Sequence, residues 1–180
     1  VSIKNLKQNN TAKEGDLLLM TKSLGTGVLS TAQKRNALKT DYYASFVNQL
    51  VRLNKIGESL GEIEGVRAMT DITGFGLLGH LIEMTGGSGV SARIQYTKLP
   101  VLPGAKEGIE NKYIPGGTNR NWNSYGHHVA FETGVEESLV MPLLADPQTN
   151  GGLLIAVDTA ALTEVKKKKK KKGLGDYINP

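Results

Sequence analysis

The sequence contains no cysteine among its 180 residues. Disulfide bonds, thiolate metal ligands and a cysteine nucleophile are therefore excluded within these residues, and the composition is compatible with a cytoplasmic protein. Aromatic residues make up only 6% of the chain, so its core must be mainly aliphatic. No apolar run approaches the roughly 20 residues of a membrane-spanning helix, and residues 1–10 carry no apolar signal segment. We therefore expect no association with membranes.

The positive charge of the chain comes from one local feature. The formal net charge is +5, with 22 basic and 17 acidic residues, and residues 166–172 are seven consecutive lysines. Without this run the remaining residues carry a net charge of −2. A run of like charges is usually solvated and less often an arm that binds nucleic acid or membranes. The run also lacks aromatic residues that could stack on bases. We expect no specific binding of nucleic acid.

The hydrophobic fraction of 39% is sufficient for the core of one domain of this length. Short apolar runs predict strands at 16–20, 66–69, 92–96, 138–144 and 153–157. Helical spacing of apolar residues predicts helices at 28–39, 43–56, 75–86 and 105–111, and a final helix capped by Thr159. Residues 1–14 are expected to be a flexible entry, and residues 113–135 a long loop. This mixture indicates an α/β or α+β domain over residues 15–180.

Glycine is abundant, with 22 residues, and its most informative cluster lies between Thr70 and His80. The segment T-D-I-T-G-F-G-L-L-G-H indicates a strand that ends near Asp71, followed by a glycine-rich turn that opens an amphipathic helix. The free N–H groups and the positive dipole end of such a helix favour an anion such as phosphate. Asp71 supplies a carboxylate of the kind that binds Mg²⁺. The alternative is that Asp71 or Thr73 only caps the helix.

Other candidate residues carry weaker signals. Arg120, in the segment P-G-G-T-N-R-N, has a guanidinium suited to phosphate, although a surface turn with an exposed arginine explains it equally well. His80 is interpreted as a buried core histidine, and the adjacent His127 and His128 lack the spacing of a zinc site. Residues 146–152, D-P-Q-T-N-G-G, could form only a turn. The sequence has neither a P-loop nor a G-x-G-x-x-G fingerprint after a strand.

Four segments, taken together and in order, resemble the C-terminal domain of the selenophosphate synthetase (selenide, water dikinase) family. They are residues 15–27 (G-D-L-L-L-M-T-K-S-L-G-T-G), 69–80, 115–121 and 146–152. The aminoimidazole ribonucleotide synthetase superfamily shares this domain architecture. The resemblance therefore implies an α/β domain of that superfamily's C-terminal type, with a mixed sheet packed against helices. The family makes selenophosphate from selenide, ATP and water, and releases AMP and phosphate.

The resemblance also implies a division of labour between two domains. An N-terminal domain, which nothing in this sequence matches, supplies the catalytic cysteine or selenocysteine, a lysine and most of the Mg²⁺-binding aspartates. No catalytic residue is therefore expected in this fragment, which should be inactive alone. The aspartate of the family's T-D-x-T-G-F-G motif falls on Asp71, the expected metal ligand, and Thr73, Gly74, Gly76 and Arg120 are expected on the phosphate side of the ATP. The intact enzyme is expected to be a cytoplasmic homodimer.

Three departures from the family pattern accompany the resemblance. Ser23 stands where the family usually has proline, and Asn150 where it commonly has serine. The lysine run occupies the place of an amphipathic terminal helix, and a final strand is expected to follow Pro180. Two other functions stay open: another ATP-dependent synthetase or kinase of the superfamily, and a binding or regulatory paralogue without catalysis. A cysteine or selenocysteine close to a lysine in the upstream sequence would favour the enzyme.

Overall fold

The computed structural model describes residues 3–171, with the side chains of residues 4 and 171 left out of the description. Its centre is a three-stranded sheet with the order β1-β3-β2, in which both pairs are antiparallel. The strands are β1 (Leu17–Met20), β2 (Val66–Asp71) and β3 (Leu153–Val157). Because β1 and β2 both run opposite to β3, their C-terminal ends lie on either side of the start of β3.

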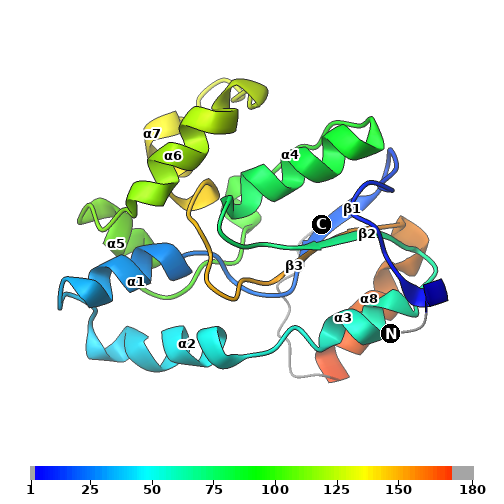
Figure 1. The fold of residues 1–180 in the computed structure, drawn as a ribbon, viewed down its shortest axis with the longest axis horizontal. Helices are drawn as coiled ribbons and strands as arrows, with labels where there is room; N and C mark the ends of the chain where they lie inside the picture. Colours follow the sequence, from blue (N-terminus) through cyan, green and yellow to red (C-terminus); the bar gives the residue numbers. More distant parts are fainter. Residues whose placement is uncertain (1–2, 172–180) are drawn as a thin grey trace.

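Helices cover both faces of this sheet (Figure 1). Helix α4 (Gly76–Ser88) lies on one face, and α3 (Ile56–Gly61) with α8 (Leu162–Lys171) lies on the other. All five residues of β3 are buried, because successive side chains enter opposite layers. Leu154 and Ala156 belong to the core beneath α4, whereas Ile155 and Val157 belong to the core against α3 and α8.

A second group of helices lies beside the sheet, at the left and top left of Figure 1. It comprises α1 (Thr26–Lys34), α2 (Thr40–Val51), α5 (Ala105–Glu110), α6 (Gly116–Tyr125) and α7 (Glu137–Leu144). Leu29, Phe46, Leu102 and Ala105 form a separate small core between α1, α2 and α5. Short 3-10 turns lie at Ile3–Asn5, Tyr96–Lys98, Gly126–His128 and Thr159–Ala161. Over residues 3–171, no helix has the length and apolar character needed to cross a membrane.

The α+β class and most of the predicted elements are confirmed. The mixed sheet that the resemblance implies is wrong, because both strand pairs are antiparallel, and three of the predicted elements are also wrong. The predicted strand at 138–144 is helix α7, in which Val140, Leu143 and Leu144 are buried at helical spacing. A short apolar run does not distinguish a buried strand from a buried helix. The predicted loop at 113–135 contains helix α6, whose buried face includes the polar residues Thr118 and Asn121. No strand forms at 92–96 within the described part of the chain.

Several boundaries also differ from the prediction. The helix expected at 28–39 begins at Thr26 and ends at Lys34. The helix expected at 43–56 is α2, which begins at Thr40 and ends at Val51, and α3 was not predicted. Thr159 does not cap the last helix: the Asp158 carboxylate accepts from the Ala160 N–H and caps a 3-10 turn before α8. The segment expected to be a flexible entry is hydrogen bonded, since the Met69 N–H donates to the Gln8 carbonyl at 3.0 Å.

Residues 166–171 of the lysine run belong to α8, but they are not solvated throughout. Lys168 Nζ donates to the Ser59 carbonyl and the Glu62 carboxylate, at 3.1 and 2.7 Å. Lys169 is only 2% exposed, and its Nζ donates to the Met20 carbonyl at 3.0 Å. The expected solvation is therefore wrong for Lys169, which packs across the end of β1. Lys172 and the expected strand after Pro180 lie outside the described residues.

Candidate active site at the strand ends

Asp71 is the last residue of β2 and is paired with Leu153 at the start of β3. Its side chain is exposed, and among residues 3–171 its carboxylate has no hydrogen-bond or ion-pair partner. The strand backbone holds the position of Asp71, because the next N–H, that of Ile72, donates to the Gly152 carbonyl at 2.8 Å. The sheet therefore holds the backbone of Asp71 in place and leaves its carboxylate exposed, without a partner among residues 3–171.

The alternative role for this motif, helix capping, is wrong. Helix α4 begins at Gly76, its N-cap residue is Phe75, and no side chain caps it. Thr73 lies too far before the helix to act as its cap, and its hydroxyl lies 3.2 Å from Nε2 of His80. His80 is 9% exposed, which confirms the prediction of a core histidine.

The turn between Asp71 and α4 is tightly fixed. The Thr73 carbonyl accepts from the N–H groups of both Gln148 and Gly76, each at 3.0 Å. Gly76 has a φ of +70°, and a Cβ at this position would lie 2.8 Å from the Ala145 carbonyl carbon, so the fold requires glycine there. Gly74, in contrast, is exposed, and a Cβ added to it would meet no atom within 4 Å. The fold therefore does not require glycine at residue 74, where a side chain would enter open space.

Helix α6 brings the third motif to this turn. The Asn121 amide nitrogen donates to the carbonyls of Gly74 and Ala145, at 2.9 and 3.0 Å. Arg120 precedes Asn121 on the helix and is exposed. Its guanidinium lies beside Gly116 and Gly117 in the first turn of α6. The structure thus joins Thr73, Gly74 and Gly76 in one turn, and it places Arg120 on the helix that supports this turn.

A buried polar cluster lies beneath the turn. The Asp146 carboxylate is fully buried, and its Oδ2 accepts from the Gly27 N–H at 3.0 Å and from the Gln148 amide at 2.6 Å. The Gln148 side-chain oxygen accepts from the N–H groups of Gly25 and Thr26, at 3.2 and 3.3 Å. These two side chains satisfy the start of helix α1, which therefore has no free N–H groups there to offer an anion.

The electrostatic environment of Asp146 is unusual. Burial raises its pKa from the ordinary 3.8 to about 7, although the bonds from Gln148, Gly27 and Val28 oppose the rise. Its second oxygen, Oδ1, is buried and has no partner within the described structure. The missing partner agrees with the raised pKa, since a buried carboxylate with an unpartnered oxygen is costly to ionise. Asp146 is therefore a structural carboxyl group beneath the site.

Lys22 fixes the opposite side of the start of β3. Its side chain is buried, and Nζ donates to the carbonyls of Arg52 and Asn150, at 2.6 and 2.7 Å. Burial, and to a lesser extent the positive charge of Arg52, lowers the pKa of Lys22 from 10.5 to about 8. Lys22 thereby ties the segment after α2 to the turn before β3, which carries Asn150.

The donor set fits a Mg²⁺ ion that is shared with other groups. Among residues 3–171, no cluster of three histidine, aspartate or glutamate side chains could hold a metal on its own. A nucleotide-bound Mg²⁺ commonly uses one or two protein carboxylates together with phosphate oxygens. The exposed Asp71 carboxylate matches one such ligand, so further ligands must come from a nucleotide or from another polypeptide segment.

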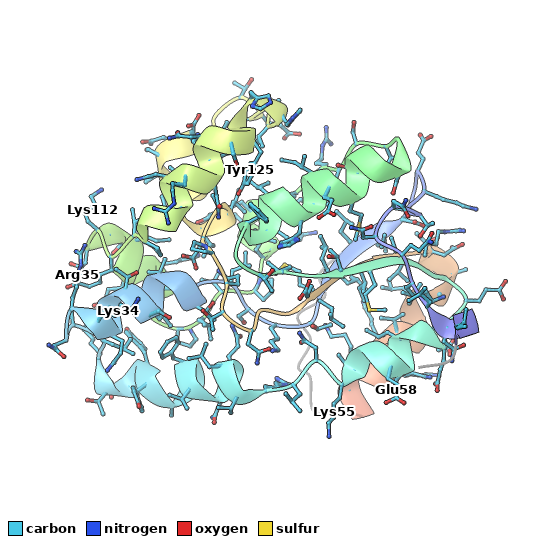
Figure 2. All side chains as sticks on the ribbon, viewed as in Figure 1. Lys34, Arg35, Lys55, Glu58, Lys112 and Tyr125 are labelled. Atoms are coloured by element: carbon cyan, nitrogen blue, oxygen red, sulfur yellow. The ribbon has the colours of Figure 1, made fainter. Side chains whose placement is uncertain are left out.

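Sequence reasoning missed several residues that build the site. Asn121, Gln148 and Lys22 lie inside the motifs singled out from the sequence, but their roles depend on partners far along the chain. Tyr125, whose hydroxyl donates to the Phe75 carbonyl at 2.7 Å, lies outside those motifs. It sits on α6 where this helix packs against α4 (Figure 2). The one signal for Tyr125 was its spacing of four residues from Asn121, which places both on one helix face.

Comparison with known proteins agrees with this architecture. Selenide, water dikinase of Photorhabdus laumondii subsp. laumondii is 47% identical over 166 residues, which are 92% of this chain and 47% of that protein. The enzyme of the same name from Escherichia coli strain K12 is 49% identical over the same shares. The chain thus spans about half the length of these relatives.

A solved structure, that of the E. coli hydrogenase maturation protein HypE, shares the fold with a TM-score of 0.64 and 23% identity. The alignment covers 94% of this chain and 43% of HypE. Residues 13–178 match the family described as AIR synthase related protein, C-terminal domain. The chain therefore belongs to the family of AIR synthase related C-terminal domains.

Proposed function

We propose that this chain is the C-terminal part of an enzyme that makes selenophosphate from selenide, ATP and water and releases AMP and phosphate. The observation that carries the proposal is the 47–49% identity to selenide, water dikinases over 92% of the chain. The exposed and unpartnered Asp71 carboxylate agrees with it, because it lies in the motif that the resemblance assigns to metal binding. The proposal rests on the sequence relationship and on this one site together.

Asp71 is the proposed ligand to Mg²⁺, and the turn formed by Thr73, Gly74 and Gly76 is the proposed phosphate side of the site. When bound, Mg²⁺ neutralises part of the charge on the polyphosphate and holds it in place. The strand fixes Asp71 without a competing partner, so its carboxylate is free to face the ion. Gly74 and Phe75, which directly precede α4, are exposed, and N–H groups at such a helix start favour a phosphate group. Arg120 would add a positive charge from the neighbouring helix.

The remaining chemistry belongs to another part of the intact protein. The chain has no cysteine, and Asp71 is one carboxylate where a metal–nucleotide site commonly has further ligands. We propose that an N-terminal domain supplies the nucleophile and the other metal ligands, that the intact enzyme is a homodimer and that it works in the cytoplasm.

Formation of AMP from ATP and selenide tests this function. The full-length protein should form AMP and orthophosphate in equal amounts, dependent on both selenide and Mg²⁺, whereas this chain alone should form none above background. A full-length protein that hydrolyses ATP to ADP, or that does not respond to selenide, would point to another kinase or synthetase of the superfamily. Sedimentation of the intact protein tests the homodimer separately.

A further inference from the structure

Three successive backbone carbonyls in the turn after Asp71 are held by donors from elsewhere in the chain. The Thr73 carbonyl accepts from the Gln148 N–H at 3.0 Å, and the Gly74 carbonyl accepts from the Asn121 amide at 2.9 Å. The Phe75 carbonyl accepts from the Tyr125 hydroxyl at 2.7 Å. Two of the three donors are side chains of helix α6.

The direction of these carbonyls determines the direction of the N–H groups. A trans peptide is planar, and its N–H points opposite to its C=O. Because the carbonyls of Thr73 and Gly74 face protein donors, the N–H groups of Gly74 and Phe75 face the other way. Both residues are exposed, with Phe75 at 61%. The two donors therefore point outward, on the turn that directly follows Asp71.

The backbone angles of the turn support the same arrangement. Phe75 has φ −71° and ψ 1°, and Gly76 follows with φ +70°. A right-handed residue followed by a left-handed one turns the N–H groups of that pair and of the next residue toward one concave side, which places the Phe75 N–H, but not that of Gly74, on this side. The Gly76 N–H closes the turn on the Thr73 carbonyl, so the N–H groups of Gly74 and Phe75 stay available to a ligand.

The two side chains of α6 are well placed to maintain this geometry. Asn121 and Tyr125 are each 8% exposed and lie one helical turn apart. Asn121 also donates to the Ala145 carbonyl at 3.0 Å, so it joins the turn after Asp71 to the segment before Asp146. A Cβ on Gly79 would lie 3.0 Å from the Tyr125 ring, so Tyr125 packs closely against α4. Burial raises the pKa of Tyr125 to about 12, so its hydroxyl remains a donor throughout the neutral range.

We propose that Asn121 and Tyr125 are positioning residues for a nucleotide phosphate. Asn121 aims the Phe75 N–H by holding the Gly74 carbonyl, and Tyr125 holds the Phe75 carbonyl and with it the Gly76 N–H that closes the turn. The inference rests on the proposed function, because it assigns the turn to the phosphate of ATP. It separates two parts of the site. The strand β2 holds Asp71, whereas helix α6 holds the turn.

This separation is tested in the full-length protein with Asn121→Leu and Tyr125→Phe. Each variant removes donors while keeping most of the side-chain volume. We expect the Kd for a non-hydrolysable ATP analogue with Mg²⁺, measured by calorimetry, to rise about tenfold in each variant, as expected for a lost buried hydrogen bond. The KM for ATP should rise in parallel. The Mg²⁺ concentration for half-maximal activity should stay within about twofold of the wild type, since Asp71 is held by the strand.

Two matched controls separate positioning from general destabilisation. Asn123→Leu makes the same change at an exposed position of α6, and Tyr43→Phe removes the hydroxyl of a tyrosine on α2 that is 50% exposed. Both should bind the analogue as the wild type does. The proposal is overturned if Asn121→Leu and Tyr125→Phe bind the analogue normally. It is also overturned if nucleotide affinity and Mg²⁺ dependence fall together in proportion to the loss of melting temperature.

The same experiment distinguishes this inference from the proposed function. A wild-type protein that binds the analogue but forms no AMP from ATP and selenide would refute the proposed reaction. The calorimetric comparison of the variants would still decide the role of Asn121 and Tyr125. A wild-type protein that binds no nucleotide would refute both.

Discussion

Replacing Asp146 with asparagine should change how the stability of the chain depends on pH. Burial raises the pKa of Asp146 from 3.8 to about 7. In the folded state the group therefore keeps its proton between these two values, while the unfolded chain loses it. The unfolded state then binds fewer protons, so the free energy of unfolding falls as the pH rises across this interval. One pKa unit corresponds to about 1.4 kcal/mol, and the whole interval to about 4 kcal/mol.

Asp146→Asn removes this titration while keeping the main contact. The asparagine oxygen can still accept from the Gly27 N–H, and the amide group replaces Oδ1, which is buried without a partner in the described structure. We expect the variant to be more stable than the wild type at pH 8 by up to about 4 kcal/mol, and the difference to shrink toward pH 4. Asp146→Ala should instead lose about 1–3 kcal/mol at pH 4, because it leaves the Gly27 N–H unsatisfied.

Urea unfolding of this chain at a series of pH values measures the effect, with Asp71→Asn as the control. Asp71 is exposed and unpartnered within residues 3–171, so its variant should follow the wild-type profile. Parallel profiles for the wild type and Asp146→Asn would refute the reasoning, because they would show that Asp146 does not titrate near pH 7 in the folded state.

Two further substitutions test the geometry around the site. Gly76→Ala should lower the free energy of unfolding by about 2–4 kcal/mol, because of the positive φ and the close Ala145 backbone. Gly74→Ala should lower it by less than about 1 kcal/mol. Equal losses of the two variants in thermal unfolding would contradict this difference. Lys22→Met should lose about 2–3 kcal/mol near pH 7, since two half-buried carbonyls lose their donor. The folded-state pKa of Lys22 is lowered to about 8, so the wild type should gain stability relative to this variant as the pH rises from 8 to 10.5. A stability difference between the two proteins that does not change with pH would be inconsistent with a buried ammonium group.

The sequence predicted the parts of the fold that depend on local apolar patterns. Strands β2 and β3 and helix α4 appeared nearly where hydrophobic spacing placed them. Helix α6 was missed because residues such as Thr118 and Asn121 form part of its buried face, and a polar face carries no hydrophobic periodicity. The apolar run of α7 was assigned to a strand because length and composition did not separate the two structures.

The candidate site could be predicted from the sequence only where its residues are contiguous. The motif around Asp71 was recognisable because its strand, turn and helix are contiguous in sequence. The buried cluster of Asp146 was not, because its partner Gly27 lies 119 residues away. The role of Asn121 could not be predicted either, since it contacts Gly74 across 47 residues through a backbone carbonyl that any sequence would supply. Hydrogen bonds to backbone leave no complementary residue for a sequence pattern to reveal.

The most direct test of the account is the turnover of Asp71→Asn in the full-length protein. If Asp71 binds Mg²⁺ in a site shared with another domain, its loss should reduce AMP formation about a hundredfold or more at saturating ATP, because the neutral amide is a poor ligand for a hard cation. The melting temperature should stay unchanged, because the carboxylate has no partner among residues 3–171. Asp41→Asn, a change at another exposed aspartate, should turn over normally. Near wild-type turnover by Asp71→Asn would contradict the assignment of Asp71 as a metal ligand.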